Sequence, residues 1–414
     1  MATIETVHIG TDAIIEMRRF CHARFADRRM VVVADRNTDA AVGSSVAEVL
    51  EADGFAVTRI VLAGDHIHAD EISLARVLAR SPSDSSLFIA AGSGTITDIT
   101  RYISFRLGMP FISVPSAASV DGYASIGSPL VIEGVKRTHY GQVPLGIFAD
   151  PAVLSAAPAE LTAAGVGDIL GKITSSADWR LGHLLWDEPF DERIAARSRD
   201  AAQICIDNIE AIAARSETGM VRLMESVIES GRCMIDFGES RPASGAEHHI
   251  SHLWEMHGLA SGVETSLHGA QVGVAALLTA DIYAQLRQLT RDDARAAVER
   301  LSYPDREAQE ADIRSAYGAM ADTIIRDHEA FLALSPDDQR ALAVRALDRW
   351  DEVQQIAAEV PTPEFFADIL RRVGGPATAE ELGLLPEHAR VGVRFGHYLR
   401  ERFTVVKLAR LLGL

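Results

Sequence analysis

The sequence has few cysteines and no long apolar run, and both shortages exclude classes of protein. Cys21, Cys205 and Cys233 are the only cysteines in 414 residues, and they are widely spaced without a CxxC pair. Neither a disulfide framework nor a thiolate zinc site is therefore indicated, and reduced, buried thiols are expected. Because no uncharged apolar stretch reaches 18 residues, we expect no membrane span.

Basic residues are also in short supply. The chain has 40 basic against 58 acidic residues, a formal charge of -18 at pH 7. A surface this negative repels phosphate backbones, so nucleic acid is not an expected partner. A small anionic substrate stays compatible with it, because a few cations inside a cleft create a local positive field. The N-terminus has early acidic residues and no continuous apolar segment, so we expect no secretory signal and a cytoplasmic location.

The texture of the sequence changes near residue 155. Before it, short apolar runs alternate with amphipathic segments, which predicts βαβ units and a parallel sheet covered on both faces. After it, helical spacing prevails and strand-like runs nearly vanish. We predict an α/β nucleotide-binding domain over 1–155 and a helical domain over 156–414, with an acidic helical tail from about 285. The expected strands are 30–35, 57–64, 86–92, 110–116 and 144–150.

A glycine-containing turn follows the third of these strands. The segment Gly92-Ser93-Gly94-Thr95 leads into a helix expected to begin near Ile96. Two glycines let backbone amides approach a pyrophosphate, and the helix dipole favours negative charge there. The usual GxGxxG pattern fails, because Thr97 occupies its sixth position. A tight structural turn and a nucleotide site are therefore both open interpretations.

Two further polar features lie beside predicted strands. The segment SVPSAASVDGYAS, residues 113–125, combines small hydroxyl residues with one carboxylate, Asp121. It could hydrogen-bond a cofactor and a substrate, or form a polar connecting loop. Asp35 follows a strand, where it could bind an adenosine ribose and favour NAD, or cap a turn or helix.

Histidines and one aspartate form a candidate metal site. EHHISH places His248 and His252 four residues apart on one helical face, with His249 turned about 100° away, and His268 follows. GVGDILGK places Asp168 and Lys172 on a shared helical face. Imidazoles and a carboxylate suit a catalytic divalent metal. The alternatives are a surface ion pair and unrelated core histidines, and the absence of HEXXH gives no support to a zinc protease.

With these residues in place, the chain resembles the sn-glycerol-1-phosphate dehydrogenase family. This family belongs to the superfamily of iron-containing alcohol dehydrogenases, glycerol dehydrogenase and dehydroquinate synthase. The matching segments, in chain order between about 35 and 276, are GSGTITD, SVPSAASVDGYAS, GIFADP, GVGDILGKITSSADWRL, SGAEHHISH and LHGAQVG. Ser93, Ser116 and Ala270 depart from residues common in the family, but none is an implied metal ligand.

The resemblance implies a fold and a set of site residues. The expected fold is a Rossmann-like α/β domain followed by an all-α domain, with the active site in the cleft between them. The implied metal ligands are Asp168, His248 and His268. Asp121 and His252 are implied catalytic and substrate-binding residues, and Asp168 also contacts substrate. The implied cofactor-binding residues are Gly94, Thr95, Ile96, Thr97, Asp98, Ser116, Ala117, Ala118, Ser119 and Ser125.

The resemblance also implies an activity. It is the interconversion of dihydroxyacetone phosphate and sn-glycerol 1-phosphate with NAD or NADP and one divalent metal, zinc before nickel or iron. The expected partner is thus a small phosphorylated three-carbon substrate, and a homodimer or larger homo-oligomer is expected. For the substrate phosphate, Lys136, Arg137 and Lys172 are candidates. The alternatives are a dehydrogenase of an unphosphorylated polyol, a cyclase like dehydroquinate synthase, which Asp168 disfavours, and a non-catalytic nucleotide sensor.

Overall fold

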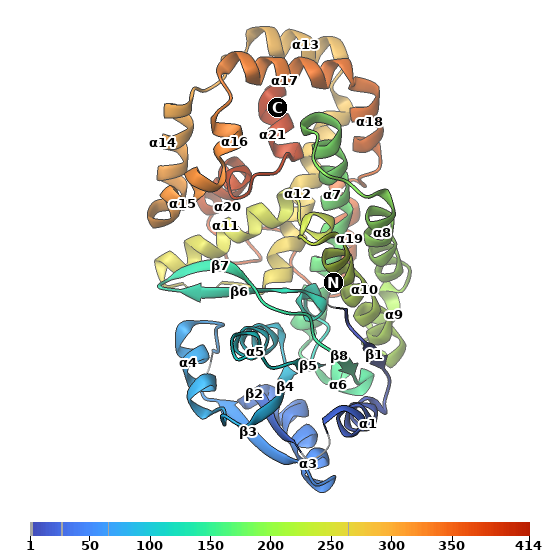
Figure 1. Ribbon diagram of the computed structural model, residues 1–414. Helices are drawn as coiled ribbons and strands as arrows, with labels where there is room; N and C mark the ends of the chain where they lie inside the picture. The colour runs from blue at the N-terminus through green and yellow to red at the C-terminus, as the bar shows by residue number, and fades with distance from the viewer. Residues whose placement is uncertain (1–2, 26–27, 65, 264) are drawn as a thin grey trace. The chain divides into compact units, whose positions relative to one another are not determined.

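The computed structural model describes residues 3–25, 28–64, 66–263 and 265–414. The chain forms two compact units (Figure 1). The first comprises Met1–Val166 and Gln203–Gly238, and the second comprises Gly167–Ala202 and Glu239–Leu414. The chain passes between the units more than once, whereas the sequence suggested a single division after residue 155, which stays a prediction.

The first unit is built on a six-stranded parallel sheet in the order β1-β8-β5-β4-β2-β3. Its strands are β1 (Thr6–Ile9), β2 (Arg29–Asp35), β3 (Ala56–Leu62), β4 (Ser85–Gly92), β5 (Phe111–Pro115) and β8 (Gly146–Ala149). The five strands predicted from the sequence are confirmed. The edge strand β1 was missed because its four half-buried residues form no apolar run.

Helices cover both faces of this sheet. They are α1 (Ala13–Phe25) and α3 (Ser44–Ala52) on one face, and α4 (Glu71–Arg80) and α5 (Gly94–Arg106) on the other. Strand β2 shows the alternation behind this arrangement, because Met30 and Val32 pack with α1 and α3 while Val31 and Val33 pack with α4 and α5. A strand buried on both faces reads as a continuous apolar run, which is why the sequence revealed it.

A two-stranded antiparallel hairpin was not predicted. It pairs β6 (Gly127–Ile132) with β7 (Val135–Tyr140) through a two-residue turn at Glu133 and Gly134. Both turn residues have positive φ, 53° and 75°, as tight hairpin turns of the primed type require. The remaining elements of this unit are α2 (Arg36–Thr38), η1 (Asp39–Gly43), η2 (Asp121–Ala124), α6 (Pro151–Ala156), α9 (Ile209–Ala213) and α10 (Glu217–Phe237).

The second unit is helical in the part of the chain that the structure describes, as predicted. Two long helices, α7 (Ala159–Trp186) and α8 (Glu192–Asp207), have segments in both units. None of the described helices is both long and apolar enough to cross a membrane. The remaining helices of this unit are η3 (Arg241–Ala243), α11 (Ala246–Ser261), α12 (His268–Gln288), α13 (Arg291–Arg300), α14 (Arg306–Tyr317), η4 (Gly318–Met320), α15 (Ala321–Asp327), α16 (Glu329–Leu332), α17 (Pro336–Asp348), α18 (Trp350–Ala358), α19 (Pro363–Arg372), α20 (Pro386–Phe395), η5 (Gly396–Tyr398) and α21 (Val405–Leu412).

Candidate active site

The turn between β4 and α5 lies where the strand order of the sheet reverses. From β2 the chain continues to β3 on one side, whereas from β4 it continues to β5 on the other. Open α/β sheets bind ligands outside the carboxyl ends of the strands at such a point. Helix α5 begins at Gly94, two residues earlier than predicted, and a Cβ on Gly94 would lie 2.9 Å from Val120 Cγ2. A side chain at Gly94 would therefore be crowded, and the amides of Gly94 and Thr95 are among the first of the helix, which have no acceptor within it.

The side chains of this turn are mostly turned inward. Ile96 and Thr97 are fully buried, and the Thr97 hydroxyl donates to the carbonyl of Ser93 at 3.0 Å. The Ser93 hydroxyl accepts from the Ile96 amide as the helix cap, at 3.5 Å. Any contact that the predicted loop makes with a dinucleotide would therefore come chiefly from its backbone at Gly94 and Thr95.

Arg101 connects the two predicted cofactor segments, and sequence reasoning missed it. The guanidinium is fully buried and donates to Asp98 Oδ1 at 2.8 Å, to the Gly127 carbonyl at 2.9 Å and to the Gly122 carbonyl. Burial raises the pKa of Asp98 to about 7, although the Arg101 cation opposes this shift. Arg101 thereby positions the end of the second segment relative to α5, and no local pattern marks it in the sequence.

The second predicted segment is compact. Ser116, Ala117, Ala118 and Ser119 are buried, and the Ser116 amide donates to the Gly92 carbonyl at 3.1 Å, joining this segment to the turn after β4. Its other end carries Ser125, whose hydroxyl accepts from the Gly127 amide at 2.9 Å.

Asp35 and Asp121 have defined partners in the first unit. Asp35 caps α2 by accepting from the amides of Asn37 and Thr38, which is the alternative interpretation left open for it. Its contact with a ribose stays a prediction. Asp121 Oδ2 accepts a hydrogen bond at 2.8 Å from the hydroxyl of Ser230 on α10. Ser230 is 109 residues away in sequence, so this partner could not be inferred from the motif around Asp121.

In the second unit, glycines allow α7 to approach α11 and α12. A Cβ on Gly167 would lie 2.2 Å from the Gly269 carbonyl oxygen, and one on Gly171 would lie 2.8 Å from Val272 Cγ1. A larger residue would push the helices apart, so the spacing of Gly167 and Gly171 around Asp168 has a structural cause. The close approach brings Asp168 on α7 toward His248 on α11 and His268 at the start of α12.

The three predicted metal ligands converge. Asp168, His248 and His268 each offer one ligand atom, and these atoms lie within 4.8 Å of one another. His248 Nε2 is 3.5 Å from Asp168 Oδ1, and the His248 and His268 ring centroids are 5.5 Å apart. Asp168 and His248 are buried, whereas 26% of the His268 side chain is exposed. One carboxylate and two imidazoles with an accessible side fit a catalytic divalent metal.

Two buried glutamates orient the imidazoles. Glu247 Oε1 lies 2.8 Å from His248 Nδ1, so Nε2 of that ring is directed to Asp168. Glu255 contacts Nδ1 of both His252 and His268, each at 2.9 Å, which leaves Nε2 of these two rings for a ligand. Carboxylates that hold the far nitrogen of a ligating histidine are typical of metal sites. The sequence analysis missed both roles, although Glu247 opens EHHISH and Glu255 follows His252 by three positions.

His252 lies beside the three ligands. Its ring stacks on that of His268, with centroids 5.0 Å apart and an interplanar angle of 19°. His252, Glu255 and His268 also form a second group whose ligand atoms lie within 4.8 Å. His249 is fully buried and belongs to neither of these groups, and burial holds its pKa well below the usual range.

Lys172 compensates the charge of Asp168. Its ammonium is fully buried and donates to Asp168 Oδ1 at 2.9 Å and to the Ala243 carbonyl at 3.0 Å. Burial acts to raise the pKa of Asp168, but Lys172 and His248 outweigh it and hold that pKa well below its usual range. Three residues were predicted to bind the substrate phosphate. Lys172 instead pairs with Asp168, one of the candidate metal ligands. Lys136 and Arg137 lie on β7.

Comparisons with known proteins agree on one family. The model of the iron-containing alcohol dehydrogenase family matches residues 8–158. The glycerol-1-phosphate dehydrogenase (NAD(P)+) of Bacillus licheniformis is 34% identical over 414 residues, which are 100% of this chain and 90% of that protein. The protein of the same name from Bacillus subtilis is 36% identical over 98% of this chain and 91% of its own.

A solved structure shows the same fold at much lower identity. The alcohol dehydrogenase from Oenococcus oeni superposes with a TM-score of 0.61 and 15% identity, covering 100% of this chain and 98% of its own. Because the two sequences have diverged so far, this likeness concerns the fold alone. A Rossmann-like sheet and a helical part are therefore shared across very different sequences.

Proposed function

The chain belongs to the glycerol-1-phosphate dehydrogenase family, and we propose that it interconverts dihydroxyacetone phosphate and sn-glycerol 1-phosphate by hydride transfer. Its relatives at 34% and 36% identity carry that activity and NAD(P)+ in their names. The geometry that carries the proposal is the convergence of Asp168, His248 and His268 within 4.8 Å.

The site would use two bound groups that divide the chemistry. A divalent metal held by Asp168, His248 and His268 would supply a Lewis acid, and a nicotinamide dinucleotide would supply or accept the hydride. The turn after β4 and the segment 116–119, together with Ser125, would bind the dinucleotide. The switch point of the sheet and the start of helix α5 at Gly94 support that assignment.

His252 is the proposed proton carrier. Its Nδ1 faces Glu255 Oε2 at 2.9 Å, so a neutral ring that donates from Nδ1 has Nε2 as an acceptor. During alcohol oxidation Nε2 would take the proton of the substrate hydroxyl, and during ketone reduction it would return it. Glu255 fixes the orientation of this ring and, through His268, of a metal ligand at the same time.

Substrate recognition is assigned to Asp121 and to a basic pair on the hairpin. Asp121 would accept a hydrogen bond from a substrate hydroxyl while Ser230 fixes the position of its carboxylate. Lys136 and Arg137 on β7 would attract the phosphate.

Zinc is the preferred metal, with nickel and iron as alternatives, because all three accept this donor set. NAD and NADP are both proposed cofactors. We predict that the chain forms a homodimer or larger homo-oligomer, which sedimentation velocity can test.

The experiment tests the dependence of turnover on both the metal and the substrate. Metal-free protein is reconstituted with zinc, nickel or iron, and the oxidation of NADH and NADPH is followed at the nicotinamide absorbance band. Dihydroxyacetone phosphate and unphosphorylated dihydroxyacetone are run side by side. We expect metal-dependent turnover with the phosphate ester and little with the free ketone.

Other outcomes would redirect the proposal. Turnover of the free ketone alone would identify a polyol dehydrogenase. Dinucleotide binding without turnover of either ketone would favour a sensor. Turnover that persists after complete removal of metal would contradict the role of Asp168, His248 and His268.

A further inference from the structure

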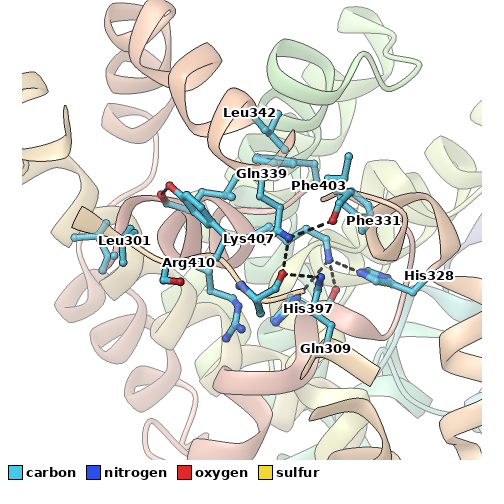
Figure 2. Close-up of a pocket in the computed structure, with 17 residues that line it drawn as sticks. Leu301, Gln309, His328, Phe331, Gln339, Leu342, His397, Phe403, Lys407 and Arg410 are labelled. Carbon is cyan, nitrogen blue, oxygen red and sulfur yellow. Dashed lines mark hydrogen bonds between the residues drawn. The ribbon is translucent and has the colours of Figure 1, made fainter. Parts of the chain in front are cut away.

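The second unit holds a cavity whose lining residues take no part in the proposed reaction. It has a volume of about 260 Å³ and is lined by residues of α14, α16, α17, η5 and α21 and of the segments beside them (Figure 2). Its walls are mixed, with apolar side chains such as Phe331, Leu342 and Phe403 beside polar ones such as Gln309 and Gln339. Pockets for drug-sized ligands begin at about 300 Å³, so this cavity suits a smaller molecule.

A buried lysine lies at one side of this cavity. Lys407 on α21 is 7% exposed, and its ammonium lies 3.0 Å from His328 Nε2 and also donates to the His397 carbonyl. Figure 2 shows Lys407 directed toward His328 and His397, and its Nζ lies 4.4 Å from the centre of the Phe331 ring. In the described part of the chain, no carboxylate forms an ion pair with it.

The carboxylates that act on Lys407, Glu188 and Glu401, are not among the residues that line the cavity. Among the described residues that line the cavity there is no aspartate or glutamate, although acidic residues exceed basic ones in the whole chain. Arg410 adds a second cation, and its own contact with Asp312 is long, at 4.0 Å. A buried ammonium without a carboxylate partner is costly, so such a group tends to lose its proton unless an anion or ligand meets it.

A polar atom beside Lys407 is unmatched. His397 is 5% exposed, and its buried Nε2 has no hydrogen-bond partner among the residues that the structure describes. His397 Nδ1 lies 3.4 Å from the Lys407 ammonium, so the two groups belong to one cluster at the cavity. A buried imidazole nitrogen without a partner can donate to an incoming oxygen.

We propose that this cavity binds a small monocarboxylate with a short aliphatic chain, whose carboxylate is received by Lys407 and His397. The single buried amine of Lys407 matches one carboxylate, whereas a phosphate dianion would also draw on Arg410, which is partly exposed. The apolar side chains of the walls would receive the chain. Burial, together with Arg410, lowers the pKa of Lys407 well below its usual value, and a bound carboxylate would reverse that shift.

The test uses the full-length, metal-loaded protein and hexanoate as the probe, followed by isothermal titration calorimetry at several temperatures. Inorganic phosphate is titrated in parallel. We expect one hexanoate site per chain, with a negative heat-capacity change from burial of the aliphatic chain, and weaker binding of phosphate. Because the metal cluster uses other residues, His248→Ala should leave hexanoate binding unchanged.

Three variants locate the site. Lys407→Met should weaken hexanoate binding at least tenfold, because it keeps the length of the side chain and removes its charge. Leu342→Phe should block binding by filling the cavity without altering any charge, which keeps the test valid if Lys407→Met folds poorly. Arg300→Gln is the matched control, because Arg300 is exposed, next to the lining residue Leu301 and outside the cavity.

The outcomes separate clearly. Hexanoate binding that is lost in Lys407→Met and Leu342→Phe but kept in Arg300→Gln would support the proposal. No binding to the unaltered protein, or binding unchanged in both cavity variants, would overturn it. Equal affinity for phosphate and hexanoate would overturn the monocarboxylate assignment.

Discussion

The turn after β4 and the candidate metal site formed by Asp168, His248 and His268 are built in opposite ways. At the turn, Ile96 and Thr97 point inward, and the groups available to a ligand are backbone amides near Gly94. At the metal cluster, every candidate ligand is a side chain, and buried carboxylates hold the far nitrogens of the imidazoles. The first site depends on the shape of the chain and the second on the identity of its residues.

This difference explains how strongly each site is marked in the sequence. A backbone site needs only that side chains stay away, so it appears as a loose glycine pattern that a tight turn shares. A side-chain site needs particular residues at particular spacings, and its supporting partners are constrained as well. Substitutions should therefore be graded by whether they remove a donor atom, a supporting partner or only a side chain.

Removal of a donor atom should have the largest effect. His248→Ala deletes one of three proposed ligands, and we expect loss of retained metal and a fall in turnover of more than about 100-fold, beyond what loss of a supporting residue costs. Metal content after dialysis and nicotinamide absorbance check this. His22→Ala is the matched control, because 67% of that side chain is exposed on α1. A variant that retains metal stoichiometrically would contradict the ligand assignment.

Removal of a supporting partner should cost less. Glu255→Gln keeps the size of the side chain but removes the charge that holds His252 and His268, each at 2.9 Å. We expect metal affinity to fall by about 10–100-fold, measured by competition with a chromogenic chelator. Glu225→Gln changes a half-exposed glutamate that pairs with Arg222 on the same helix and should leave affinity unaltered. Equal losses in both variants would show that general charge, not orientation, matters.

The same distinction accounts for what the sequence could predict. Five of the six sheet strands were predicted because apolar residues dominate them, and the convergence of Asp168, His248 and His268 followed from motifs that matched a family in order. Ser230 and Arg101 were not found, because they act through contacts 109 and up to 26 residues away in the chain. The close packing of α7 against the backbone at Gly269 could not be predicted either, because a glycine in the sequence does not identify the backbone that approaches it.

At the turn after β4, a bulkier side chain should weaken dinucleotide binding, whereas removal of a side chain should have little effect. Gly94→Val places a branched side chain where a Cβ already lies 2.9 Å from Val120 Cγ2, and overpacking of about 1–3 kcal/mol should weaken dinucleotide binding roughly tenfold. Thr95→Ala removes only a side chain and should change the Kd less than about threefold, because the amide stays in place. Fluorescence titration with NADH measures both. A larger loss in Thr95→Ala than in Gly94→Val would refute the backbone interpretation.

The smallest effect concerns the cysteines, which all lie in the first unit and are buried. Burial raises the pKa of both Cys21 and Cys205 to about 12. At pH 8 only about one thiol in ten thousand would then be ionised, so a thiol reagent such as dithionitrobenzoate should react very slowly. Because no proposed metal ligand lies in this unit, removal of metal by a chelator should leave the reaction rate within about twofold. Rapid reaction only after chelation would mean that the metal also stabilises the dinucleotide-binding unit, and the two sites could no longer be treated as separate in their effects on stability.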